Sequence, residues 1–121
     1  MTAKREHSRT ERKLVATLTH ACEQATYQLP GFEWLTHRVD YQHFPHSLVV
    51  TWVFDTSANL SKALNSDAKQ LMLALTATAL AEAGVGIRDI TQHVDFDSEQ
   101  ECLRTHNGDW KRRLRSTTTR P

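Results

Sequence analysis

Apolar and polar positions alternate most clearly between residues 31 and 55, which read GFEWLTHRVDYQHFPHSLVVTWVFD. Two runs rich in aromatic and β-branched residues flank the loop Tyr41–Ser47, and this pattern predicts a β-hairpin. A register with Trp34 opposite Trp52 also pairs Phe32 with Phe54 and Thr36 with Val50. Aromatic pairs of this kind stabilise adjacent strands. We therefore expect this aromatic face of the hairpin to pack on helices.

The other face of the hairpin is less polar than a solvated face should be. Its apolar residues are Leu35, Val39, Val49 and Val53. Such a face needs cover, which either a helix of the same chain or a second chain can supply. In the second case these four residues form the contact of a homodimer.

Helical periodicity covers much of the remaining chain. Ser8 and Glu11 form a capping box ahead of an apolar stripe that runs from Leu14 to Leu29, so residues 1–7 are expected to be disordered. Shorter helices are predicted at Ala58–Leu64, after the capping residue Ser98, and from Trp110. The segment Ala68–Ala83 is apolar nearly all round, which predicts a central, largely buried helix.

Alternation from Ile90 to Phe96 predicts a third strand. The order α-β-β-α-α-β-α indicates an α+β fold, with a small three-stranded, mainly antiparallel sheet packed with helices. A chain of 121 residues forms one domain, expected to span residues 8–115 and to be followed by a disordered tail, Ser116–Pro121.

Charge is distributed unevenly along the chain. The net charge is +1 overall, but it is +3 over residues 1–13, −7 over residues 14–103 and +5 over residues 104–121. Basic ends around an acidic body suggest a polyanionic partner. No apolar run approaches the length of a membrane span, and the N-terminus lacks a secretory h-region, so a cytoplasmic location without a membrane partner is expected.

Catalytic and cofactor signatures are absent from the sequence. It contains no G-x-S-x-G, P-loop or G-x-G-x-x-G motif, so we expect a non-enzymatic protein without a cofactor. A small zinc-binding protein is one alternative, because histidine and cysteine are zinc ligands. The weak candidate ligands are His43, His46, Cys102 and His106.

The C-terminal segment offers the best binding candidate. Trp110 lies beside Lys111, Arg112, Arg113 and Arg115, and a tryptophan can stack on a base while the cations neutralise phosphates. Alternatively, Trp110 and Leu114 dock this helix on the body and leave the cations in water. The N-terminal cations Arg9, Arg12 and Lys13 are expected to assist binding.

The order of elements resembles that of type II KH-like folds, such as the ribosome-binding factor A and BolA families. The position of the KH nucleic-acid loop reads Asn65–Ser66–Asp67–Ala68 here, without glycine. The hairpin and the following helix are also similar to small bacterial proteins labelled Fis-like regulators. Together, charge and resemblance predict an accessory or regulatory protein that binds RNA, DNA or a ribonucleoprotein. The alternative is a protein-interaction module or homodimer.

Overall fold

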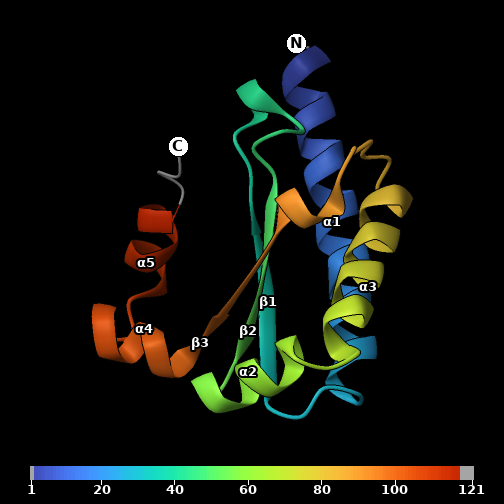
Figure 1. The fold of residues 1–121 in the computed structure, drawn as a ribbon. Coiled ribbons are helices and arrows are strands. Elements are labelled where there is room, and N and C mark those ends of the chain that lie inside the picture. The colour runs from blue at the N-terminus through green and yellow to red at the C-terminus, as the bar shows by residue number, and fades with distance from the viewer. Residues whose placement is uncertain (1, 118–121) are drawn as a thin grey trace.

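A computed structural model of the protein describes the backbone of residues 2–117 and the side chains of residues 5–115. The elements are α1 (Thr2–Thr26), β1 (Phe32–Arg38), the short 3-10 turn η1 (Tyr41–His43), β2 (Val49–Phe54), α2 (Ser57–Leu64), α3 (Ala68–Glu82), the 3-10 turn η2 (Ile90–His93), β3 (Val94–Ser98), α4 (Glu99–His106) and α5 (Trp110–Thr117) (Figure 1). The predicted α+β class and the predicted order of helices and strands are confirmed.

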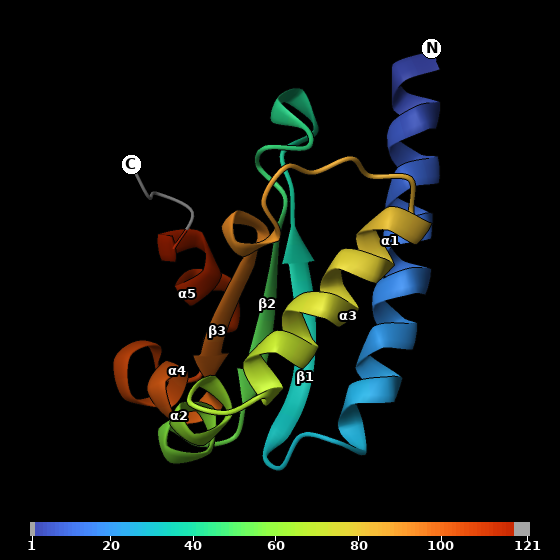
Figure 2. The same cartoon turned by 45° about the vertical axis from the view of Figure 1, so that its right-hand side comes forward.

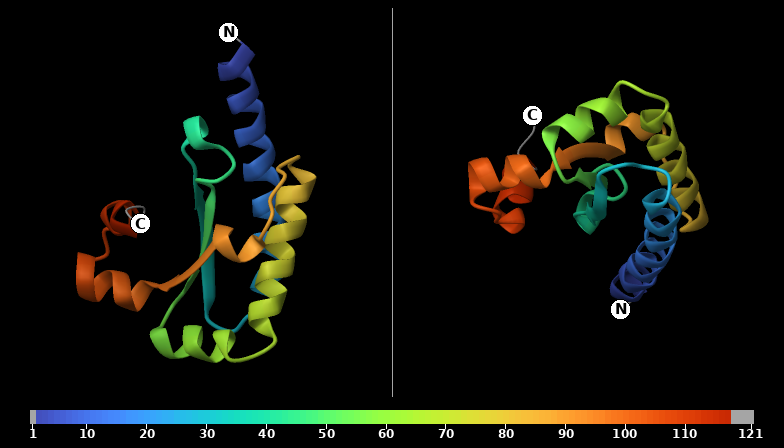
Figure 3. Two further views of the ribbon diagram at one scale, coloured as in Figure 1. Left: turned by 45° about the horizontal axis from the view of Figure 1, so that its top comes forward. Right: turned by 90° about the horizontal axis from the view of Figure 1, so that it is seen from below.

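The sheet lies between two groups of helices. The long helix α1 and the helix α3 cover one face of the sheet, which is called face A here. The short helices α4 and α5 lie on the opposite side, called face B (Figures 2 and 3). The helix α2 crosses the end of the sheet that is farthest from the hairpin loop (Figure 1).

The sheet is mixed. Its strand order is β1-β2-β3, with β1 and β2 antiparallel and β2 and β3 parallel. After β2 the chain passes through α2 and α3 and returns to the end of the sheet at which β2 begins. The next strand, β3, therefore runs parallel to β2, as a crossover connection of this kind allows. The expected mainly antiparallel arrangement therefore holds for the hairpin and not for β3.

A β-bulge at Glu33 changes the hairpin register. Phe32 pairs with Phe54 as predicted, but Trp34 pairs with Val53 because Glu33 is an extra residue in β1. The predicted pairing of Trp34 with Trp52 is therefore wrong, and so is that of Thr36 with Val50: Leu35 lies opposite Trp52, and Thr36 lies opposite Thr51. A bulge inserts one residue and reverses the faces of all side chains that follow it.

The two tryptophans of the hairpin consequently lie on opposite faces. Trp52 is fully buried on face A, where its indole N–H donates to Thr76 Oγ1 of α3 at 3.0 Å. Trp34 is half-buried on face B, where its ring contacts that of Trp110 in α5. Each group of helices therefore has its own aromatic anchor on the sheet.

The bulge also divides the apolar face that was predicted to form a dimer contact. Leu35 moves to face A, where it packs with Val39 against the core. Val53 is 0% exposed, and Val49 is half-buried. Leu35, Val39, Val49 and Val53 therefore do not form one exposed surface, because the chain's own elements cover them to different degrees.

The core on face A follows from the predicted apolar stripe of α1. Leu14, Leu18, Ala21 and Ala25 are buried, and they recur at the three- and four-residue steps of a helix face. The predicted helix Ala68–Ala83 is present as α3, and the stripe that includes Met72 and Leu80 is buried. The expectation of a largely buried helix is wrong for its other side, where Lys69, Ala74 and Thr78 are exposed. Both helices thus bury one stripe against each other and the sheet.

Three predicted boundaries differ from the structure. The helix α1 begins at Thr2, so Ser8 lies inside it and does not cap it, since the good helix formers of residues 3–6 extend the helix backwards. Residues Ser116 and Thr117 belong to α5, whereas Thr118–Pro121 lie outside the described residues. The third strand begins at Val94, because the side chain of Asp89 accepts from the Thr91 N–H and starts the turn η2 instead.

We predict that replacing Trp52 by Ala lowers the free energy of unfolding by about 3–5 kcal/mol, as expected when a large, fully buried aromatic side chain is removed. Urea denaturation monitored by circular dichroism measures the loss. A loss below about 1 kcal/mol would contradict the burial of this side chain. Tyr27→Ala, at a residue that is 92% exposed, is the control and should change stability by less than about 0.5 kcal/mol.

Candidate functional site

A carboxylate shared by two tryptophans fixes α5 on face B. Glu99 Oε1 accepts hydrogen bonds from Trp34 Nε1 at 2.6 Å and from Trp110 Nε1 at 3.2 Å. The two indole rings meet edge to face, with centroids 4.9 Å apart and an interplanar angle of 83°. This geometry is favourable for aromatic pairs. Trp110 therefore docks α5 on the sheet, as the alternative interpretation of the sequence predicts.

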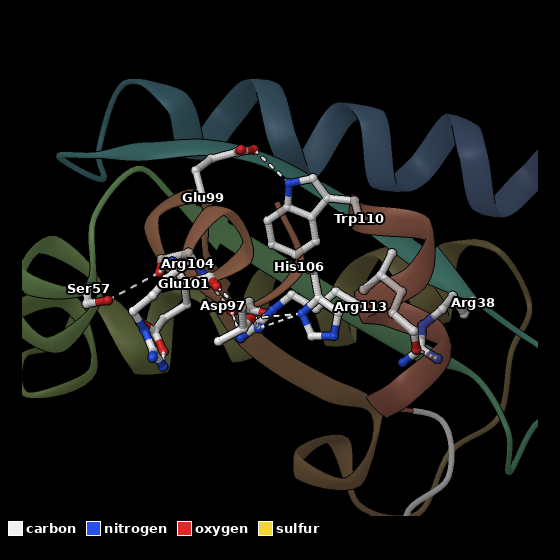
Figure 4. A network of polar contacts seen from close by, with 12 residues as sticks. Arg38, Ser57, Asp97, Glu99, Glu101, Arg104, His106, Trp110 and Arg113 are labelled. Carbon is white, nitrogen blue, oxygen red and sulfur yellow. Dashed lines mark hydrogen bonds and ion pairs between the residues drawn. The ribbon is translucent and has the colours of Figure 1, made fainter. Parts of the chain in front are cut away.

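A bidentate ion pair completes the docking. Arg113 donates through Nε and Nη2 to the two carboxylate oxygens of Asp97 in β3, at 2.6 and 2.8 Å (Figure 4). The two side chains are only 17% and 12% exposed. The hydrogen bonds to Asp97 raise the pKa of Arg113 above its usual value. The expectation that all cations of this helix lie in solvent is wrong for Arg113.

The sequence pattern of β3 explains this pairing. Val94 and Phe96 pair with Val50 and Trp52 on face A, so the alternating Asp97 points to face B. The backbone of α5 is held as well, because Arg38 Nη1 donates to the carbonyl of Leu114 at 2.8 Å (Figure 4). Arg38, Asp97 and Glu99 are distant in sequence from α5, and only the sheet brings them together there.

The remaining predicted nucleic-acid residues of α5 are Lys111, Arg112 and Arg115, and all three are exposed. The segment that leads from β3 into α4 carries Asp95, Asp97, Glu99 and Glu101, but Asp97 is paired with Arg113 and Glu101 with Arg104. The two paired carboxylates therefore add little net negative charge beside α5.

The N-terminal cations form a more open basic surface. Arg5, Arg9, Arg12 and Lys13 are exposed on α1, and none of the four makes a hydrogen bond or ion pair with a described residue. On a helix these positions share one face, and that face lies opposite the buried stripe of α1. We call these four residues the basic stripe.

The two basic segments of the chain lie on opposite sides of the sheet. The basic stripe belongs to α1, which covers face A, whereas α5 lies on face B (Figure 3). The structure therefore does not join Arg9, Arg12 and Lys13 with the cations of α5 into one surface. The sequence favours the C-terminal segment, but in the structure the basic stripe is the group of exposed cations that makes no hydrogen bond or ion pair with a described residue.

A cluster of polar side chains ties α1 to the hairpin loop. The Glu11 carboxylate contacts His37 Nε2 at 3.0 and 3.1 Å and accepts from the Tyr41 hydroxyl at 2.8 Å. One turn earlier, His7 stacks on the Tyr41 ring at a centroid distance of 4.7 Å. Burial alone would raise the pKa of Glu11, but the hydrogen bonds from Tyr41 and His37 outweigh it and lower that pKa. Burial and the bond to Glu11 raise the pKa of Tyr41.

No sequence pattern predicts this cluster. Glu11 was assigned to a capping box, and no local pattern connects it to His37 or Tyr41, which follow 26 and 30 positions later. A possible signal is the position of Glu11 on the apolar stripe that contains Leu14 and Leu18, where a carboxylate requires a partner.

The candidate zinc ligands occupy two separate places. His43 lies in the hairpin loop, where it pairs with Asp40, and His46 is exposed nearby. Cys102 and His106 belong to α4, which begins at the far end of β2, where Phe54 pairs with Ser98. Among residues 2–117, no three His, Cys, Asp or Glu side chains are grouped so that they could hold a metal ion. Both cysteines are free thiols, and burial raises the pKa of Cys102.

We predict that Arg113→Ala lowers the free energy of unfolding by about 1.5–3 kcal/mol, the range for hydrogen bonds to charged groups, because it leaves Asp97 without its partner. Chemical denaturation, with tryptophan fluorescence as a second signal for the contact of Trp34 with Trp110, measures this loss. The matched control is Lys111→Ala, at an exposed neighbour, which should change stability by less than about 0.5 kcal/mol. Equal effects of the two changes would contradict the docking role of Arg113.

We also predict a pH-dependent contribution from Glu11. A carboxyl group with a lowered pKa stabilises the folded state above its ordinary pKa of about 4.3, and this stabilisation is lost as the pH falls through the lowered value. The wild type should therefore be more stable than Glu11→Gln near neutral pH, and the difference should vanish in acid. Thermal melts of both proteins between neutral and acidic pH test the prediction, and Glu6→Gln, at an exposed residue, is the control. A difference that does not change with pH would contradict it.

No helix among the described residues is both long enough and apolar enough to cross a membrane. Comparison of the chain with known protein families, with curated proteins and with solved structures found no match.

Proposed function

We propose that this protein is a small, non-enzymatic accessory or regulatory protein that binds nucleic acid through the basic stripe of α1. The observation that carries this proposal is the exposure of Arg5, Arg9, Arg12 and Lys13 on one helix face, without an acidic partner among the described residues. Cations that are not paired within the protein can replace the counterions of a phosphate backbone, and release of those counterions favours binding.

The charge layout supports contact at this surface and opposes it elsewhere. The chain between residues 14 and 103 carries a net charge of −7, which repels a polyanion. Within α1 itself, Glu11 is directed to His37 and Tyr41, and Glu6 remains as an exposed acidic residue on the flank of the stripe. Binding is therefore confined to a small surface, and its affinity should be modest and strongly salt-dependent.

The cations Lys111, Arg112 and Arg115 of α5 have a secondary role in this proposal. They belong to α5, which lies on the other side of the sheet from α1. They assist when the nucleic acid is long enough to pass around the molecule, and they do not contribute to the binding of a short oligonucleotide.

We predict that the protein binds a labelled oligonucleotide at low salt and that reversing Arg9 and Arg12 to Glu weakens binding by at least about tenfold. For four phosphate contacts, raising the salt from about 50 to about 200 mM should weaken the wild type on the order of 100-fold. Fluorescence anisotropy measures both effects, and thermal melts verify that the variant is folded. Reversing Lys62 and Lys69, two exposed cations on α2 and α3, changes the net charge equally and serves as the matched control.

Two outcomes would contradict the proposal. The first is the absence of binding at low salt, and the second is an equal loss in the α1 variant and in the Lys62 and Lys69 control. Either would favour the alternative function, a protein-interaction module. That alternative would use the groove of about 250 Å³ between α1 and β1, where Val15 is 50% exposed and Leu18, Cys22 and Leu35 form apolar walls.

A further inference from the structure

We infer that the basic stripe of α1 inserts into the major groove of double-stranded DNA. This inference rests on the proposed function and adds to it the class of nucleic acid and the way in which the protein holds it. Four properties of α1 carry it: the angular spread of the cations, the projection of the helix, the anchoring of the helix, and the absence of an exposed aromatic side chain on the stripe.

The cations spread around the outer side of α1 and do not form a single line. Consecutive helical residues point about 100° apart, so Arg12 and Lys13 diverge by that angle, and Arg5 and Arg9 lie between them. The stripe is about 12 Å long, from a rise of about 1.5 Å per residue. Arg12 can therefore reach phosphates on one wall of a groove, and Lys13 can reach those on the other. Arg9 then points to the floor, where arginine is the commonest reader of guanine.

The N-terminal part of α1 extends past α3 and the strands and lies beside the hairpin loop. In Figures 1 and 2 its first turns stand clear of α3 and of the strands. The major groove of B-DNA is about 12 Å wide and admits one α-helix with its side chains. Only the first turns of α1 stand clear, because Glu11 bonds to His37 of β1 and Leu14 is buried in the core. The outer side of the helix carries all four cations and is exposed at each of them, so this side can face the groove.

The projecting helix is anchored on its inner side. Glu11 bonds to His37 and Tyr41, and His7 stacks on the Tyr41 ring. These contacts face the hairpin loop and leave the opposite side of the helix open. The orientation of the stripe relative to the sheet is therefore set before binding, which reduces the conformational entropy lost when DNA binds.

Other polyanions fit this surface less well. The major groove of A-form RNA is too deep and narrow for side chains to read. Single strands are usually held by exposed aromatic rings. Tyr41 already stacks with His7 and with Phe44, and the exposed Tyr27 lies beyond the C-terminal end of α1. Insertion into a membrane surface requires an apolar helix face, and that of α1 is buried in the core.

The test compares the full-length protein on four labelled probes of one sequence. These are duplex DNA, duplex RNA, single-stranded DNA, and duplex DNA with glucosylated 5-hydroxymethylcytosine, whose sugar fills the major groove. Affinity for plain duplex DNA should exceed that for the other three by at least about tenfold, because only this probe offers an open groove of about 12 Å. Distamycin, which fills the minor groove, should leave binding to duplex DNA unchanged.

The outcomes separate this inference from the proposed function. If all four probes bind equally and Arg9→Glu/Arg12→Glu still weakens binding, the stripe makes only phosphate contacts and the groove inference is overturned. Competition by distamycin would overturn it as well. If no probe binds, the proposed function itself fails. Glu11→Gln is a second variant that keeps all four cations. Weaker binding of this variant to duplex DNA alone supports a helix orientation that is set before binding. Unchanged binding contradicts the anchoring role of Glu11.

Discussion

The β-bulge at Glu33 determines how the two helical groups attach to the sheet. A regular hairpin would place Trp34 and Trp52 on the same face, and face B would then lack an aromatic anchor. The extra residue turns Trp34 to face B, where Glu99 binds its indole together with that of Trp110. Trp52 stays on face A and bonds to Thr76. One inserted residue thus allows a sheet of three strands to support helices on both sides.

Attachment of α5 uses charges that would otherwise be available to a ligand. Arg113 lies in the most basic part of the sequence, yet its guanidinium is held by Asp97 in a largely buried bidentate pair. Fork-shaped pairs of this type are among the stronger polar contacts in proteins. Net charge along the chain therefore overstates the basic character of the C-terminal surface. The basic stripe of α1 has no such internal partner among the described residues and keeps its full charge toward solvent.

A carboxylate also fixes the position of α1. Glu11, inside a helix with several cations, is directed inward to His37 and Tyr41, so its negative charge is removed from the side where the basic stripe lies. These contacts hold the helix against the end of β1, through His37, and against the hairpin loop, through Tyr41. The position of this one carboxylate therefore anchors the helix and keeps its negative charge away from the basic stripe.

The sequence by itself determined the α+β class, the order of the elements, the buried stripe of α1 and the cap at Ser98, because each depends on residues within a few positions of one another. It also located the basic segments. Only the tertiary structure decided which residues face each other across the sheet. The bulge at Glu33, the pairing of Arg113 with Asp97 and the contacts of Glu11 depend on strand register and on residues far apart in the chain, and local periodicity carries no information about such distances.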